Sequence, residues 1–275
     1  MNKLVEVVFL KGLITFLRGA FVGGTMTVPG VSGGTMAIII GVYEKLLYSI
    51  NNIRRNPKES IKFLIGFSAG GIVGFLLLAR LVTSLIDNNT TGAFMRFLFS
   101  GIVLGGIPLL VKKSGMKKIT LGNVSFMLLG ATVVIALSLL PEGSFLSDNF
   151  LMNIILRFIG GVIVAIALIL PGISATHMLY VLGLYSEVLE LVYSFKFLEL
   201  IPLAAGGIIG ILLTAKGIEK LIEKYTLSIY MVIIGFVAGS LVSLLKGVMV
   251  ENVLAYFMFI PGFLIMHFVS KRVEE

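Results

Sequence analysis

Two short polar stretches have residue types that suit the binding of an anion. The stretches are Ser32–Thr35 and Ser174–His177, and each follows a Pro-Gly pair and precedes an apolar run. This pattern predicts a helix N-terminus, where free N–H groups, the positive end of the helix dipole and hydroxyl donors favour a phosphate. The plainer alternative is that Pro-Gly breaks one helix and the hydroxyl groups cap the next.

Two arginines, Arg18 and Arg157, precede these stretches within apolar sequence. A guanidinium held in a membrane is costly and needs a partner, and it binds phosphate through two parallel hydrogen bonds. We expect both to assist at the polar stretches; the alternative is that both snorkel to the interface. For His177, phosphate binding, proton transfer and a neutral structural role stay open. We expect Arg80 and Arg96 to be interface anchors.

The composition predicts an all-α polytopic membrane protein. Of 275 residues, 57% are hydrophobic and 13% are charged, against roughly 25% charged in soluble domains. The net charge of +8 fits the positive-inside rule and does not indicate nucleic-acid binding. Every Asp and Glu, including Glu44, falls in a connecting region or at a segment edge. A carboxylate metal site, a chain of membrane carboxylates for protons, or a bound cofactor is therefore not expected.

Loop charge predicts the topology. The basic loops 51–62, 112–118 and 216–224, together with the C-terminus, should be cytoplasmic, and the other connections are poor in Lys and Arg. Segment 13–50 then begins and ends inside, and segment 151–193 begins and ends outside. Each is either a re-entrant hairpin with Pro-Gly at its tip, which we favour, or two full crossings. Both termini are predicted to be cytoplasmic.

An internal repeat supports this topology. Pro29-Gly30-Val31-Ser32 matches Pro171-Gly172-Ile173-Ser174, and the Ala-Gly-Gly-Ile motif at 69–72 recurs at 205–208. Each half holds one hairpin and three crossings, and an odd number of crossings inverts the second half. The predicted fold is two inverted-topology repeats, each a re-entrant helical hairpin plus three transmembrane helices. The first repeat is 1–144, with hairpin 13–50 and crossings near 61–81, 94–111 and 119–140; the second is 145–275, with hairpin 151–193 and crossings near 197–216, 225–246 and 252–270.

The two Pro-Gly regions also carry a resemblance. Val28 to Leu46, and Ile169–Ser174 with Leu182–Tyr185, resemble the two signatures of the bacterial PopT polyprenyl-phosphate transporters. The resemblance implies a protein of the bacterial cytoplasmic membrane. It also implies translocation of undecaprenyl phosphate, the carrier lipid of cell-wall synthesis, to the cytoplasmic leaflet for reuse.

The resulting hypothesis is a flippase whose isoprenoid substrate tail stays in lipid while the protein binds the phosphate. Its predicted partners are undecaprenyl phosphate and the bilayer, with no nucleic acid; the oligomeric state is left open, and a homo-oligomer is compatible with the sequence. The residues expected to contact the phosphate are Arg18, Ser32, Gly33, Gly34, Thr35, Arg157, Ser174, Thr176 and His177.

Two rival functions stay open, a membrane polyprenyl-pyrophosphate phosphatase and a small-anion transporter. Such phosphatases resemble this chain in their repeats and Pro-Gly-x-Ser tips. Their tip serine is followed by an arginine with glutamates nearby, whereas Gly33 follows Ser32 here and no glutamate precedes either tip within its apolar run. A general base or metal ligand for hydrolysis is therefore missing, and we predict a transporter rather than an enzyme.

Overall fold

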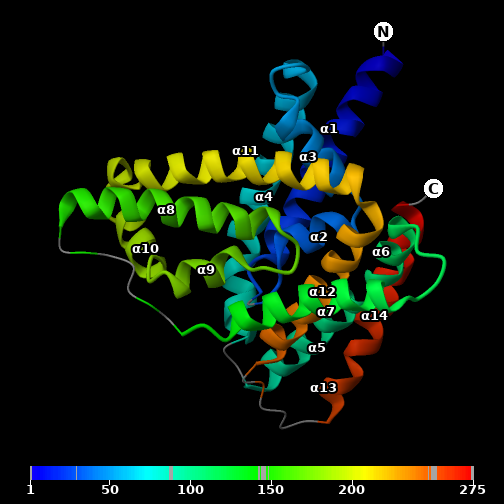
Figure 1. The fold of residues 1–275 in the computed structure, drawn as a ribbon. Coiled ribbons are helices and arrows are strands. Elements are labelled where there is room, and N and C mark those ends of the chain that lie inside the picture. The colour runs from blue at the N-terminus through cyan, green and yellow to red at the C-terminus, as the bar shows by residue number, and fades with distance from the viewer. Residues whose placement is uncertain are drawn as a thin grey trace.

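The computed structural model describes residues 2–28, 30–86, 89–141, 143, 147, 149–246, 248 and 253–273, and every regular element within these ranges is helical (Figure 1). Pro29 and the side chain of Arg80 lie outside this description. The elements in chain order are α1 (Asn2–Thr25), α2 (Gly33–Ile39), α3 (Tyr43–Asn51), α4 (Pro57–Ile86), α5 (Asn89–Gly105), α6 (Ile107–Ser114), α7 (Leu121–Ser138), α8 (Phe150–Ile169), α9 (Ala175–Val181), α10 (Tyr185–Tyr193), the 3-10 helix η1 (Phe197–Leu200), α11 (Ile201–Lys224), α12 (Thr226–Leu245), α13 (Leu254–Phe257) and α14 (Phe259–Val273).

The described helices suit a membrane, as the composition predicts. Six stretches are long and apolar enough to cross a bilayer: Pro57–Ala79, Thr91–Ser114, Leu121–Ser138, Phe150–Ile169, Phe197–Lys224 and Thr226–Leu245. Large apolar side chains point outward from them, such as Leu76 and Leu77 of α4, which are 65% and 71% exposed. Water would penalise such surfaces and lipid would not. The prediction of an all-α multi-pass membrane protein is confirmed.

One of these stretches bears on the predicted hairpins. Phe150–Ile169 forms α8, the first arm of the second hairpin, and it is long enough to cross a membrane alone. The second arm is broken into the short helices α9 and α10. Helix length therefore does not decide between a re-entrant loop and two crossings, and the re-entrant form stays a prediction.

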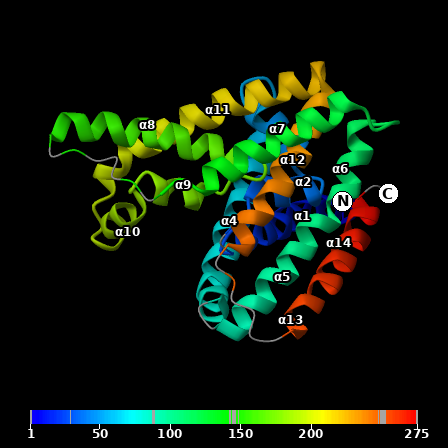
Figure 2. The ribbon, with the colours of Figure 1, turned by 60° about the horizontal axis from the view of Figure 1, so that its bottom comes forward.

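Four pairs of helices pack along their lengths: α1 with α4, α8 with α11, α7 with α12, and α5 with α14 (Figures 1 and 2). Glycines permit this close packing. A Cβ atom at Gly70 of α4 would collide with the carbonyl of Phe16 in α1, and one at Gly206 of α11 would collide with the carbonyl of Phe158 in α8. Both glycines belong to the repeated Ala-Gly-Gly-Ile motif, which therefore brings helix backbones together.

The two Pro-Gly segments share the same local structure. Each begins with a glycine at positive φ (Gly30, +86°, and Gly172, +81°), a conformation that disfavours side chains. A serine N-cap and a helix of 7 residues follow, α2 in the first segment and α9 in the second. A second glycine at positive φ and a helix of 9 residues complete each segment. The sequence repeat is thus also a repeat of local structure.

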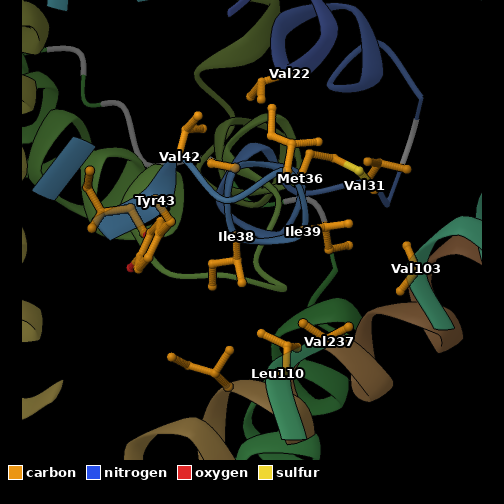
Figure 3. Packing of buried hydrophobic residues seen from close by; sticks show 14 of the residues in the cluster. Val22, Val31, Met36, Ile38, Ile39, Val42, Tyr43, Val103, Leu110 and Val237 are labelled. Atoms are coloured by element: carbon orange, nitrogen blue, oxygen red, sulfur yellow. The ribbon is translucent and has the colours of Figure 1, made fainter. Parts of the chain in front are cut away.

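The core surrounds α2, all of whose residues are buried. Figure 3 shows Ile38 and Ile39 on the side of α2 that faces Leu110 of α6 and Val237 of α12. Helix α12 also supports both Pro-Gly turns. A Cβ at Gly30 would lie 2.8 Å from the Cα of Leu244, and one at Gly172 would collide with the carbonyl of Phe236. The two turns therefore pack at different heights along one central helix.

Candidate functional site

The two Pro-Gly tips are in direct contact. The buried hydroxyl of Thr35, in the first turn of α2, accepts a hydrogen bond of 2.7 Å from the backbone N–H of Gly172. The hydroxyl of Tyr43 donates to the carbonyl of Ile169, at 2.9 Å. Gly34 fits here because a Cβ would lie 3.1 Å from that carbonyl oxygen. Ser32 is also buried, with its Oγ 3.5 Å from the carbonyl oxygen of Leu170, which is too long for a strong bond.

The second tip is fastened by its own polar residues. Ser174 caps α9 by accepting a hydrogen bond of 3.3 Å from the backbone N–H of His177. The Nε2 of His177 lies 3.1 Å from the carbonyl oxygen of Leu137 near the end of α7, so the tautomer protonated at Nε2 donates there. Thr176 is half-buried beside them. In this structure His177 joins α9 to the C-terminal end of α7.

Residues of both Pro-Gly turns line a small cavity, which we call the tip cavity. Its volume is about 10 Å³, enough for about one water molecule. Both turn glycines line it, and so do three serines and His177. Its lining residues are Gly30, Val134, Leu137, Ser138, Gly172, Ile173, Ser174, His177, Met178 and Ser243.

A larger cavity of about 350 Å³, which we call the apolar cavity, adjoins the first tip. One end is the start of α2, at Gly33 and Gly34, and α1, α3, α4, α8 and α11 supply the remaining wall. It reaches the molecular surface, because its wall includes Ile208 and Leu212, which are 60% and 43% exposed. Nearly all lining side chains are apolar, so it suits a hydrocarbon chain. They include Val22, Met26, Ala37, Leu46, Ile50, Leu64, Phe67, Leu168, Ile169 and Ile211.

The structure does not bring Arg18 or Arg157 to the tips. Arg18 is exposed and lines a separate groove between α1, α5 and α14. Arg157 pairs with Glu187, with Nη2 2.6 Å from Oε1, and its Nη1 donates to the backbone carbonyl of Glu199. It lies 12 helical residues before Ile169, about 18 Å along the axis of α8. Arg157 therefore fastens α8 to α10 and η1.

Two other cations lie near the tips. Arg96 of α5 is half-buried and its Nη1 donates to the carbonyl of Leu244, at 3.1 Å, on the α12 residue against which Gly30 packs. The Nζ of Lys246 donates to the carbonyl of Ser138, at 3.3 Å, at the edge of the tip cavity. The sequence alone predicts only an anchoring role for Arg96 and no role for Lys246. The available signal was a lone arginine before the apolar run 97–111.

Glu44 at the start of α3 joins three helices. Its Oε1 accepts hydrogen bonds from the hydroxyl of Tyr230, at 2.7 Å, and from the Nζ of Lys113, at 2.8 Å. Partial burial raises the pKa of Glu44, but the hydrogen bonds from Lys113 and Tyr230 outweigh this and hold the pKa below its ordinary value. Among the described residues, no three His, Asp or Glu side chains are grouped so that they could hold a metal ion.

Comparisons with known proteins place the chain in a family of membrane transporters. The chain is 31% identical to the polyprenyl-phosphate transporter of Staphylococcus aureus over 270 residues, covering 92% of this chain and 94% of that protein. It is 29% identical to the polyprenyl-phosphate transporter of Vibrio cholerae over 227 residues, covering 78% of this chain and 71% of that protein. No solved structure gives a significant match. A family model described as undecaprenyl phosphate translocase-like matches residues 22–256, and the chain therefore belongs to the undecaprenyl phosphate translocase-like family.

Proposed function

We propose that this protein moves polyprenyl phosphate, specifically undecaprenyl phosphate, between the leaflets of a bacterial cytoplasmic membrane. In this role it returns the carrier lipid of cell-wall synthesis to the cytoplasmic leaflet. The family membership, the names of the two relatives and the six apolar spans support this proposal.

The observation that carries the proposal is the position of the apolar cavity. It reaches the surface at Leu212 and ends at the backbone of Gly33 and Gly34, beside the contact between Thr35 and Gly172. A polyprenyl phosphate has one long apolar chain and one anionic end. The cavity can hold part of the chain, while the hydroxyl and N–H groups of the tips lie where the phosphate must pass.

The same proposal includes inverted repeats, 1–144 and 145–275, whose hairpins are re-entrant. The matching local structure of the two Pro-Gly segments supports it, and so does the packing of α1 on α4 and of α8 on α11. A small shift of one repeat against the other would open the tips alternately to each leaflet. Where helices contact through glycine, no large side chains interlock, so the helices can slide past each other in such a shift.

A phosphatase is the main rival. Its chemistry needs a nucleophile or activated water together with a base. The Ser32 hydroxyl is buried, and the carboxylate of Glu44, at the start of α3, is bound to Lys113 and Tyr230. Incubating the purified protein with a polyprenyl pyrophosphate tests this. No phosphate release is expected, and release that Ser32→Ala abolishes would contradict a purely transporting role.

A small-anion transporter is the second rival. Native mass spectrometry of protein purified from a bacterial membrane separates the two. Our proposal predicts a retained lipid with the mass of a polyprenyl phosphate. Such a lipid should be lost when Leu212 in the wall of the apolar cavity is replaced by tryptophan. A protein that never retains lipid yet carries phosphate ions in vesicles would support the rival.

A further inference from the structure

We infer that Arg96 and Lys246 are the cations that bind the anionic headgroup at the tip cavity, in place of Arg18 and Arg157. This inference rests on the proposed function and assigns the headgroup site within it. Arg18 is exposed in another groove, and Arg157 is paired with Glu187. Among the described residues, neither Arg96 nor Lys246 has a carboxylate partner.

Arg96 is the stronger of the two. It lies in the apolar span Thr91–Ser114 and is half-buried, a position that is costly for a charge without a partner. Its described bond uses one of the five guanidinium N–H groups, toward the carbonyl of Leu244. Leu244 is the neighbour of Ser243, which lines the tip cavity. Donors therefore remain for a phosphate, which a planar guanidinium binds through paired bonds.

Lys246 approaches the same cavity at Ser138. It follows the last residue of α12. Its ammonium donates to the carbonyl of Ser138, and Ser138 lines the cavity. An ammonium has three donors, and one is used in this bond. The loop charges of the sequence predict that this end of α12 faces away from the cytoplasm. The two cations would then meet headgroups that arrive from the outer leaflet.

The cavity supplies neutral donors close to the two cations. Ser243, Ser174 and His177 line it, together with the turn glycines of both tips. Phosphate needs several donors around its oxygens, and this set offers the hydroxyl groups of Ser243 and Ser174. The present volume of about 10 Å³ holds about one water. A phosphate therefore binds when the turns at Gly30 and Gly172 move away from α12, which couples binding to an opening of the tips.

A purely structural role for the same contacts has a physical basis. Cations near the C-terminal ends of α7 and α12 stabilise carbonyls that have no helical partner. The structural role predicts that removal lowers the melting temperature and leaves affinity unchanged. The headgroup role predicts a loss of affinity specific to ligands that carry a phosphate.

The test measures how three ligands raise the melting temperature of the detergent-purified protein, and converts the shifts to dissociation constants. Farnesyl phosphate has both an isoprenoid chain and a phosphate group. Farnesol has the isoprenoid chain alone, and inorganic phosphate has the anionic group alone. The variants are Arg96→Gln, Lys246→Gln and Arg96→Lys. Arg55→Gln and Lys118→Gln are matched controls, because both cations are exposed on connections between helices.

The inference predicts that Arg96→Gln and Lys246→Gln each weaken farnesyl phosphate binding by about tenfold or more, as expected for one charge-assisted hydrogen bond. Farnesol binding and both controls should not change, and Arg96→Lys should recover part of the affinity. Unchanged affinity in both glutamine variants would overturn the inference. Lys246 is exposed, so its variant is informative even if Arg96→Gln does not fold.

Two further outcomes separate the inference from the proposed function. A wild-type protein that binds farnesol as tightly as farnesyl phosphate would contradict the proposed function itself. Inorganic phosphate that binds as tightly as farnesyl phosphate, and loses affinity in the glutamine variants, would overturn the assignment to a lipid headgroup and indicate a free-anion site.

Discussion

The hydroxyl of Thr35 accepts a hydrogen bond from the backbone N–H of Gly172, and this bond joins the two Pro-Gly tips directly. Gly172 has φ of +81° and packs against α12. Its N–H therefore lies in a turn, where no helical carbonyl accepts it. Thr35 is 1% exposed, and water cannot easily replace it. This bond therefore joins the two halves of the chain at the candidate site.

Thr35→Val should destabilise the contact between the tips. The substitution keeps the shape of the side chain but removes the acceptor, and an unsatisfied buried N–H costs about 1–3 kcal/mol. The measurement is the melting temperature in detergent. Thr35→Ser keeps a hydroxyl and should lie close to wild type. Equal melting temperatures for the valine and serine variants would show that the bond contributes nothing.

Gly206→Ala should separate α11 from α8. The added Cβ would collide with the carbonyl of Phe158, and overpacking of this kind costs about 1–3 kcal/mol. Gly217 lies on the same helix, and no atom lies within 4 Å of the position that its Cβ would occupy. Gly217→Ala should therefore be neutral or stabilising, since alanine favours a helix by up to about 1 kcal/mol. Similar losses of stability at both positions would refute the role of close backbone packing.

Leu212→Trp should reduce transport without unfolding the protein. Leu212 lines the apolar cavity and is 43% exposed, so a larger side chain fits at the surface and fills the cavity. The neighbouring Leu213 is 66% exposed and is absent from the cavity wall. Leu213→Trp is thus a matched control. Transport rates in vesicles are the measurement, and an equal effect at the two positions would argue against the cavity as the path of the lipid chain.

Acid should remove the stability contributed by Glu44. Because Lys113 and Tyr230 hold the pKa of this carboxyl below its ordinary value of 4.5 in the folded state, the unfolded chain takes up its proton first as the pH falls. The contribution is therefore complete above about pH 5 and is lost as pH falls through the folded pKa.

Melting temperatures of wild type and Glu44→Gln between pH 7 and pH 3 check this. The wild type should be the more stable at neutral pH, and its advantage should shrink at the acid end. Solvent screening of a carboxylate that is 56% exposed keeps the effect small. An advantage that grows toward low pH would contradict the sign of the shift.

Much of the fold follows from the sequence alone. The uncharged runs predict membrane helices because only internally hydrogen-bonded segments are stable in lipid, and the structure confirms an all-helical membrane protein over the residues that it describes. The repeated Pro-Gly-x-Ser and Ala-Gly-Gly-Ile motifs predict matching local structures, since glycine at positive φ and glycine at helix contacts have clear physical causes. These motifs recur with the same turns and the same kind of contact.

The partners of the charged residues could not be predicted in the same way. Arg157 and Glu187 meet only because the chain brings the start of α10 back to α8, and Arg96 reaches α12 only through long-range packing. The spacing of a cation from a Pro-Gly pair does not contain this information. The sequence predicts that both polar stretches contact one phosphate. For the same reason it does not predict the hydrogen bond between Thr35 and the N–H of Gly172.

The central claim is that the protein carries a polyprenyl phosphate between leaflets. Vesicles containing the purified protein and a polyprenyl phosphate in both leaflets are treated with a soluble phosphatase added outside. The enzyme reaches only outward-facing headgroups. Our account predicts that hydrolysis runs to completion in vesicles with the protein and stops near one half in vesicles without it. Hydrolysis that stops near one half in both would contradict the account.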